Sequence, residues 1–260
     1  ATTRLLTRER FVVACRHSEL FACPPCGVGT TRCSLEHPVE RRVAINTIGP
    51  YWDGNEVWLV VGAAAIFAAF PSWYATWFSA GYLALVLLIA ALIMRGVSFE
   101  FRGKVDSDRW RRTWSGTLTI GSALAPFLTG VALGDLLVGL PVDSDQEFTG
   151  SFWSLLTPYG LWMGLTLLTL CLLHGATFLG LKTTAQVRDR AHTIARRLAW
   201  VAAAVVVAYV GWTFVLSDNR GVLAVVLLAL AVVAVIVAAV TAGRGRDGRA
   251  FATTSVAIAA

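Results

Sequence analysis

The chain has few charged residues. Only 15% of its 260 residues are Asp, Glu, Lys or Arg, while 56% are hydrophobic. A soluble domain carries about 25% charged residues, so this chain has too few of them to cover a water-facing surface. Several apolar runs reach the roughly 20 residues that cross the hydrocarbon core of a bilayer. The composition therefore excludes an ordinary soluble domain and predicts an all-α, polytopic transmembrane helical bundle.

Several functional signatures are also missing from the sequence. It contains no glycine-rich phosphate loop, no Walker lysine and no nucleophile elbow, and its first 40 residues hold no apolar core typical of a secretory signal peptide. The formal net charge of +6 does not indicate a nucleic-acid partner. The basic residues lie almost entirely in short loops between apolar runs, a pattern that signals orientation in a membrane.

Cysteine is confined to the N-terminal region, apart from Cys171 inside an apolar run. The other four cysteines are Cys15, Cys23, Cys26 and Cys33. Together with His17 and His37 they could close a tetrahedral zinc site, but one Cys-x-x-Cys with irregular flanking spacings is a weak signal. We therefore expect no metal site, and we predict that residues 1–38 are a disordered or mistranslated leader to a transmembrane domain at 39–260.

Six apolar runs have the length of membrane spans. They cover roughly residues 54–70, 75–94, 115–133, 160–181, 198–216 and 222–242. Pro71 and Ser72 are predicted to turn the chain between the first two spans, and Pro126 to kink the third. A seventh run from Ala250 stops at Ala260, too short to cross a bilayer. We expect about six full spans plus a cut-off seventh, in a domain that is incomplete at its C-terminus.

Basic residues alternate regularly with these spans. Nearly all Lys and Arg residues after Glu40 fall in four segments, which are 41–42, 95–112, 182–197 and 244–249. The intervening segment 135–157 is acidic and has no Lys or Arg, so it is predicted to lie outside. Because cytoplasmic loops of membrane proteins carry the excess of basic residues, we place the four basic segments on the cytoplasmic side.

Two carboxylates, Asp53 and Glu56, lie at the start of the first predicted span. Carboxylates near hydrocarbon are costly and usually functional. Residues three apart share one face of a helix, which favours a proton-uptake point at the cytoplasmic entrance. The same spacing fits a capping box, in which Asp53 caps free N–H groups and Glu56 reaches back. Spacing alone leaves both interpretations open, and the two roles are compatible.

Three further polar residues are secondary candidates. Glu100, beyond the second span, is expected to form an interfacial ion pair with Arg95 or Arg102. His174 is the one histidine inside a predicted span. We expect a buried imidazole that is hydrogen-bonded to a neighbouring helix. A haem axial ligand is the alternative, but no second histidine within a span pairs with it.

Several motifs together resemble one family. They are IGPYWDGNEVW, FAAFPSWYATWFSAGYL, MRGVSFEFRGK, RWRRTW, GVALGDLLVGLP, GSFWSLLTPYGLWMGL and HGATFLGLKTTAQVRDRA. On these residues the sequence resembles subunit II of the cytochrome bd-type quinol oxidases of bacterial respiratory chains. The resemblance covers about residues 40–197 and continues in hydropathy only. Of the family's opening element, only Gly27, Val28 and Gly29 match, and family members continue past the point where this chain ends.

The resemblance implies a multi-pass subunit of the bacterial cytoplasmic membrane. Such complexes oxidise quinol, reduce dioxygen to water and conserve the energy as a proton gradient. Haems b and d and the quinol site are expected on the partner, subunit I, with no redox centre on this chain. The acid of the family motif corresponds to Asp53, which favours proton delivery. Trp52, Gly54, Asn55 and Trp58 fall in the same motif as supporting residues.

Two rival functions come from other classes. A secondary transporter would use Asp53 and Glu56 as coupling carboxylates and the paired hairpins as repeats. Transporter sites lie near the bilayer midplane, whereas these carboxylates are predicted at its edge. The second rival is a purely structural membrane subunit, in which Asp53 only caps a helix.

Overall fold

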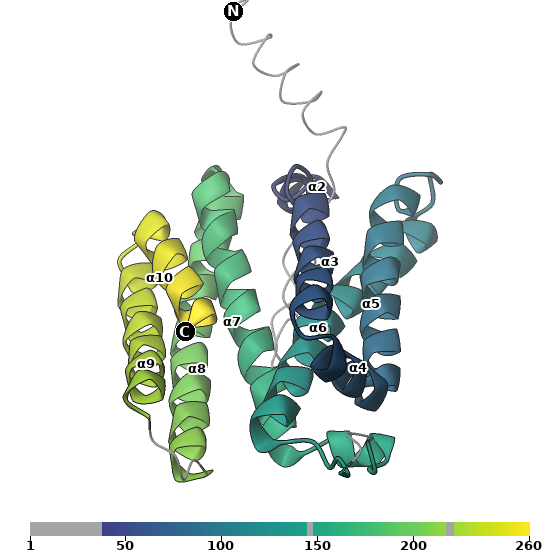
Figure 1. Ribbon diagram of the computed structural model, residues 1–260. Helices are drawn as coiled ribbons and strands as arrows, with labels where there is room; N and C mark the ends of the chain where they lie inside the picture. Colours follow the sequence, from purple (N-terminus) through teal and green to yellow (C-terminus); the bar gives the residue numbers. More distant parts are fainter. Residues whose placement is uncertain (1–37, 145–147, 217–220) are drawn as a thin grey trace, which may run out of the picture. The chain divides into compact units, whose positions relative to one another are not determined.

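The computed structural model describes residues 38–144, 148–216 and 221–260, and within them the secondary structure is almost entirely helical (Figure 1). The exceptions are a 3-10 turn at Phe152–Leu155 and an isolated bridge between Val142 and Phe148. The all-α class is therefore confirmed. The predicted leader, with its cysteines, lies outside the described residues except for Pro38. The chain divides into two compact units, which we describe separately.

The first unit comprises the described residues up to Phe78 together with Ile89–Ser122. Its helices are α2 (Pro38–Asn46), α3 (Trp52–Ala69), most of α4 (Pro71–Ala80), the second half of α5 (Tyr82–Phe101) and the first half of α6 (Asp108–Val138). The connection between α5 and α6 is only residues 102–107, so most of the basic segment 95–112 is helical. Long basic side chains can extend from such helix ends into the membrane interface, so helices that continue beyond the apolar runs are compatible with a membrane.

The break predicted near Pro71 is observed, but Pro71 and Ser72 begin a helix instead of forming a turn. Proline fits the first position of a helix because it has no N–H to satisfy there. Pro71 accordingly follows a single non-helical residue, Phe70, and begins α4. The run predicted as one span at 75–94 is divided at Gly81 between α4 and α5. The aromatic rings of α4 stack along the helix, with centroids 5.3 Å apart for Trp73 and Trp77.

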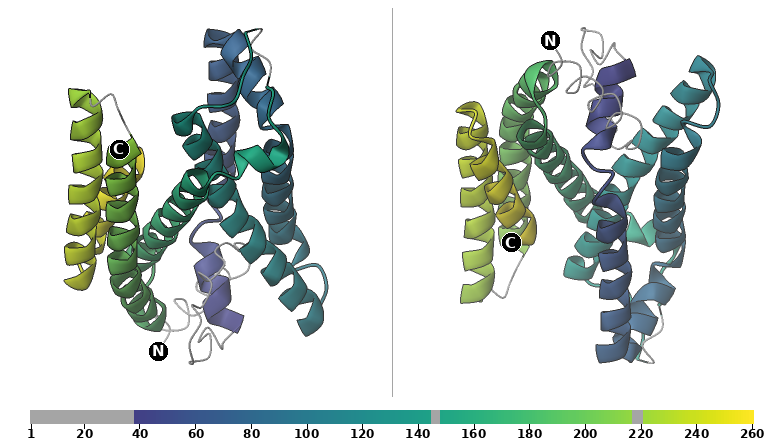
Figure 2. Two further views of the ribbon diagram at one scale, coloured as in Figure 1. Left: turned by 90° about the horizontal axis from the view of Figure 1, so that it is seen from below. Right: turned by 90° about the horizontal axis from the view of Figure 1, so that it is seen from above.

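The second unit comprises Ser79–Leu88 and Ala123–Ala260. It contains α7 (Pro158–Lys182), α8 (Ala185–Leu216), α9 (Val222–Gly243) and α10 (Asp247–Ala259). Helix α8 packs between α7 and α9, and α10 lies against α7 and α9 (Figures 1 and 2). Alanines dominate the core, with Ala199, Ala202 and Ala250 fully buried around Leu173 and Val235. Small residues let membrane helices approach closely, so this unit is packed through short side chains.

Five helices in the described part of the chain are long and apolar enough to cross a membrane. They are α5, α6, α7, α8 and α9. Each includes one of the predicted spans, in whole or in large part. Helix α3 covers the first predicted span, but it has 18 residues and is not among the five. Its first two turns contain Asp53, Asn55 and Glu56, which lower its mean hydropathy. The cut-off seventh run forms the 13-residue helix α10.

Helices α6 and α7 cross at very short range through four glycines. A Cβ atom built on Gly130 would lie 2.7 Å from the Cα atom of Gly164, and one on Gly134 would lie 2.7 Å from the Cα atom of Gly160. These distances are shorter than any real side chain tolerates. The two helices therefore pack backbone against backbone, the arrangement that small residues spaced four apart allow in membranes.

Candidate functional site

The start of α3 does not place Asp53 and Glu56 at the positions that a capping box requires. The helix begins at Trp52 and its N-cap is Tyr51, with no side-chain hydrogen bond to the free N–H groups. A turn before the helix fixes this start, because the Trp52 N–H already donates to the Ile48 carbonyl at 3.1 Å. Asp53 is thus inside the first turn, so the capping-box interpretation is wrong. Its exposed carboxylate still lies near the positive end of the helix dipole, which is favourable.

Glu56 forms a cross-helix ion pair. Its Oε1 atom lies 3.5 Å from Nη1 of Arg95 on α5, and the two side chains are only 25% and 20% exposed. The same Oε1 atom is buried and accepts no hydrogen bond from the described residues. A buried carboxylate oxygen that accepts no hydrogen bond is energetically costly, so the attraction of Arg95 is the contact that offsets the burial of this atom.

Two aromatic rings lie near this ion pair. The rings of Trp52 and Phe99 meet edge to face at 4.8 Å between centroids, and the Arg95 guanidinium lies 5.9 Å above the Phe99 ring. Gly96 of α5 lies beside the Trp52 ring, where an added Cβ would make an ordinary contact at 3.7 Å. We call this group, Trp52, Asp53, Glu56, Arg95 and Phe99, the mouth site. It carries an exposed acid and, one turn further along α3, a half-buried one.

The expected pairing of Glu100 is not observed. Glu100 is exposed, and no ion pair joins it to another described residue. Arg95 contacts Glu56 instead, and Arg102 is buried and donates from Nε to the Ser115 hydroxyl at 2.9 Å. The side chains of Arg95 and Arg102 thus contact α3 and α6 and not Glu100. Its position at the last turn of α5 leaves it facing solvent or headgroups.

The other motif residues of α3 do not join the mouth site. A Cβ added at Gly54 would have no atom within 4 Å, Asn55 is exposed, and the Trp58 side chain is 73% exposed. Helix α3 has no buried residue within the described part of the chain. Its apolar side chains are therefore available to lipid or to another subunit.

His174 is hydrogen-bonded to a neighbouring helix, as predicted, but it is only partly buried. Its Nδ1 atom lies 2.8 Å from the Thr254 hydroxyl on α10, and its ring stacks on Phe251 at 4.3 Å between centroids. Both contacts use the imidazole for helix packing. No group of three or more His, Cys, Asp or Glu residues that could hold a metal ion occurs among the described residues.

Two buried carboxylates were missed by the sequence analysis. Asp135 was predicted in an outer loop, but it lies on α6, is 5% exposed, and accepts a hydrogen bond from the Thr157 hydroxyl at 2.8 Å. Thr157 caps α7, and its oxygen accepts from the Gly160 N–H at 2.9 Å. The motif GVALGDLLVGLP places Asp135 directly after a packing glycine, which is the signal that could have identified it.

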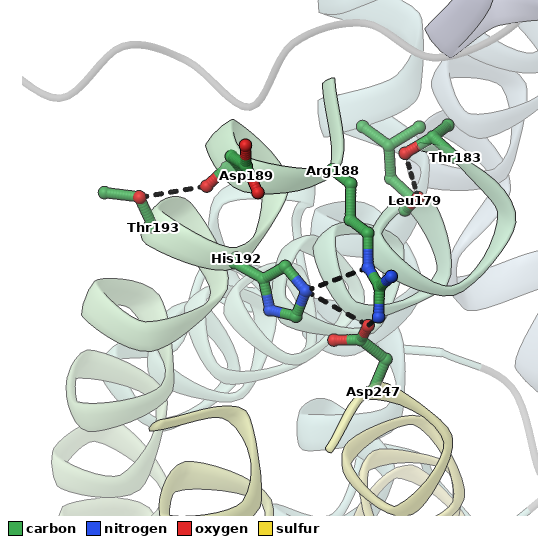
Figure 3. A network of polar contacts seen from close by, with 7 residues as sticks. All are labelled: Leu179, Thr183, Arg188, Asp189, His192, Thr193 and Asp247. Atoms are coloured by element: carbon green, nitrogen blue, oxygen red, sulfur yellow. Dashed lines mark hydrogen bonds and ion pairs between the residues drawn. The ribbon is translucent and has the colours of Figure 1, made fainter. Parts of the chain in front are cut away.

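Asp247 is the second missed carboxylate and the centre of a polar network (Figure 3). Its Oδ2 atom lies 3.2 Å from Nη2 of Arg188 and 3.1 Å from Nε2 of His192, and its side chain is 8% exposed. It also approaches α7, because a Cβ on Gly180 would lie 3.2 Å from its Oδ1 atom. One carboxylate therefore ties together α7, α8 and the start of α10.

Comparison with known proteins gives consistent matches. A family model described as cytochrome bd terminal oxidase subunit II matches residues 25–260. The cytochrome bd ubiquinol oxidase subunit 2 of Bacillus subtilis (strain 168) is 40% identical over 237 residues, which are 90% of this chain and 70% of that protein.

Two further relatives match a shorter part of the chain. The probable cytochrome oxidase subunit 2 of Haemophilus influenzae is 46% identical over 61% of this chain and 43% of its own length. The cytochrome bd-I ubiquinol oxidase subunit 2 of Escherichia coli (strain K12) is 41% identical over 67% of this chain and 48% of its own length. The chain thus spans less than half of these two relatives.

Proposed function

Because the chain belongs to the cytochrome bd terminal oxidase subunit II family, we propose that it serves a complex that oxidises quinol and reduces dioxygen to water. The family match over residues 25–260 carries this proposal. The five long apolar helices agree with a multi-pass protein of the bacterial cytoplasmic membrane. Subunit I is the proposed partner and the proposed holder of haems b and d, since the one histidine in a predicted span of this chain is engaged with Thr254 and Phe251.

Within that complex we assign the mouth site to proton uptake from the cytoplasm. Asp53 is exposed at the start of α3, while Glu56 is one turn further along and half-buried beside Arg95. Residues three apart on a helix lie on the same face, so a proton taken up at Asp53 has Glu56 as its next acceptor. Arg95 stabilises the ionised form of Glu56, and its guanidinium also lies 5.9 Å from the centroid of the Phe99 ring.

Co-purification tests the assignment to the oxidase. We expect an affinity-tagged version of this chain, expressed in its membrane, to bring down a haem-bearing subunit. The purified assembly should consume oxygen when quinol is added. A chain that purifies without haem from a membrane containing the oxidase would contradict the proposal. Substrate accumulation by vesicles that hold this chain alone would favour a transporter.

A double-mutant cycle tests the ion pair of the mouth site. We expect Glu56→Gln and Arg95→Gln to be coupled by about 1 kcal/mol in the thermal unfolding of the assembled complex, because the two side chains are largely withdrawn from solvent. The matched control is the pair Arg111 and Asp106, which are 2.6 Å apart but 39% and 98% exposed. Solvent and salt screen the attraction within an exposed pair, so we expect a smaller coupling between Arg111 and Asp106, and equal coupling in the two cycles would contradict the placement of Glu56 against Arg95.

A further inference from the structure

Basic side chains from two separate sequence segments converge at one end of the second unit. We call this surface the basic end. It consists of Lys182, Arg188, His192, Arg196, Arg197, Arg244, Arg246 and Arg249. Asp247 fixes the convergence, since it contacts Arg188 and His192 of α8 and approaches Gly180 of α7 (Figure 3). The turn between α9 and α10 is part of the same surface, because a Cβ on Gly245 would lie 3.9 Å from the His192 ring.

The charge of the basic end is directed outward. Asp247 is buried, and its carboxylate is shared by Arg188 and His192. The remaining arginines are exposed, and none is in an ion pair with a carboxylate of the described residues; they are Arg196, Arg197, Arg244, Arg246 and Arg249. This surface therefore carries an excess of positive charge and has the planar, bidentate donors that suit phosphate oxygens.

Exposed apolar side chains lie within one helical turn of these basic residues along the chain, and we call them the apolar band. Trp200 follows Arg196 by one helical turn and is 59% exposed, and Val201, which follows Arg197 in the same way, is 52% exposed. At the ends of the neighbouring helices, Leu181 is 46% exposed and Val240 is 37% exposed. Tryptophan is enriched at the boundary between hydrocarbon and headgroups. A ligand that matches the whole surface has an anionic head and an apolar tail.

We propose that the basic end is a binding site for anionic phospholipid, with the phosphodiester held by Arg244, Arg246 and Arg249 and the acyl chains lying along the apolar band. A soluble phosphate compound would leave the band without a partner, which is why lipid is favoured. The basic residues that set orientation need only be present on one side of the membrane. In the basic end, residues from two separate sequence segments also converge around one buried carboxylate, Asp247.

Native mass spectrometry of the purified oxidase complex tests this site, with phosphatidylglycerol and phosphatidylcholine as probes. Each basic residue near a membrane surface contributes about fivefold to the binding of anionic lipid. We therefore expect Arg244→Gln/Arg246→Gln/Arg249→Gln to weaken retention of phosphatidylglycerol by about 20- to 100-fold and to leave phosphatidylcholine unchanged. Replacing the same three residues by lysine should preserve part of the preference, because the charge and the membrane orientation are kept while the bidentate hydrogen bonds of arginine are lost.

The control removes the same charge from the other unit. Lys104→Gln/Arg109→Gln/Arg112→Gln alters exposed basic residues around the α5–α6 connection, and we expect it to keep the preference for phosphatidylglycerol. An equal loss in this control would overturn the proposal, as would a parent complex that binds both lipids alike. Displacement of phosphatidylglycerol by excess inorganic phosphate would show a free-anion site instead. Loss of another subunit in the glutamine variant, with lipid retained, would show a protein interface.

Discussion

An oxidase complex that carries Asp53→Asn is expected to consume oxygen at least about tenfold more slowly than the parent complex, with its haem content unchanged. Proton transfer by a positioned side chain typically contributes about 10²–10⁴-fold, and asparagine cannot take up a proton. Assembly should survive, because the Asp53 side chain makes no capping hydrogen bond and lies exposed in the first turn of α3. Quinol-driven oxygen consumption and proton uptake by proteoliposomes measure the effect.

Two further variants test whether the loss of oxygen-consumption rate is due to the carboxylate of Asp53. Asp53→Glu keeps an ionisable group and should recover most of the rate. Asp106→Asn removes an exposed carboxylate from the α5–α6 connection and should leave the rate unaltered. Normal turnover and proton uptake in a correctly assembled Asp53→Asn complex would remove the proton role and leave Asp53 as part of a structural subunit.

The centres of the long helices were predictable from sequence, whereas their ends were not. Apolar runs locate α7 and α9 closely, because a span needs a minimum length of hydrocarbon-compatible residues. Hydropathy carries no signal for where helical hydrogen bonding stops. Helix α8 thus begins at Ala185, well before the apolar run at 198–216, and α6 continues through Asp135. Polar residues at helix ends were consequently assigned to loops.

The mouth site was predictable in part. Spacing within one helix identifies the face that Asp53 and Glu56 share. It does not identify what packs against that face, so the pairing of Glu56 with Arg95 appeared only in the structure. The capping-box interpretation was wrong for a related reason. The turn that begins at Ile48 starts the helix at Trp52, so Asp53 is inside the helix and is not its cap. Asp247 was missed because its partners are distant in sequence.

The glycine crossing of α6 and α7 gives the largest expected effect on stability. A Cβ on Gly164 would lie 2.8 Å from both the Phe127 carbonyl oxygen and the Val131 side chain. Because one contact is backbone, neither helix can yield by changing a rotamer. We expect Gly164→Ala to lower the free energy of unfolding by about 1–3 kcal/mol, and Gly164→Leu by more than about 4 kcal/mol, in equilibrium unfolding of the complex in mixed micelles.

Gly211 on α8 provides the matched control, since no atom lies within 4 Å of a Cβ at that position. Gly211→Ala should be neutral or should stabilise the protein by up to about 1 kcal/mol, because alanine is the better helix former. Similar effects at Gly164 and Gly211 would mean that helix propensity alone acts at both sites and that α6 and α7 do not touch. A loss confined to Gly164 would instead show that close backbone packing holds α7 in place. The same crossing brings Asp135 within hydrogen-bond distance of Thr157, the cap of α7.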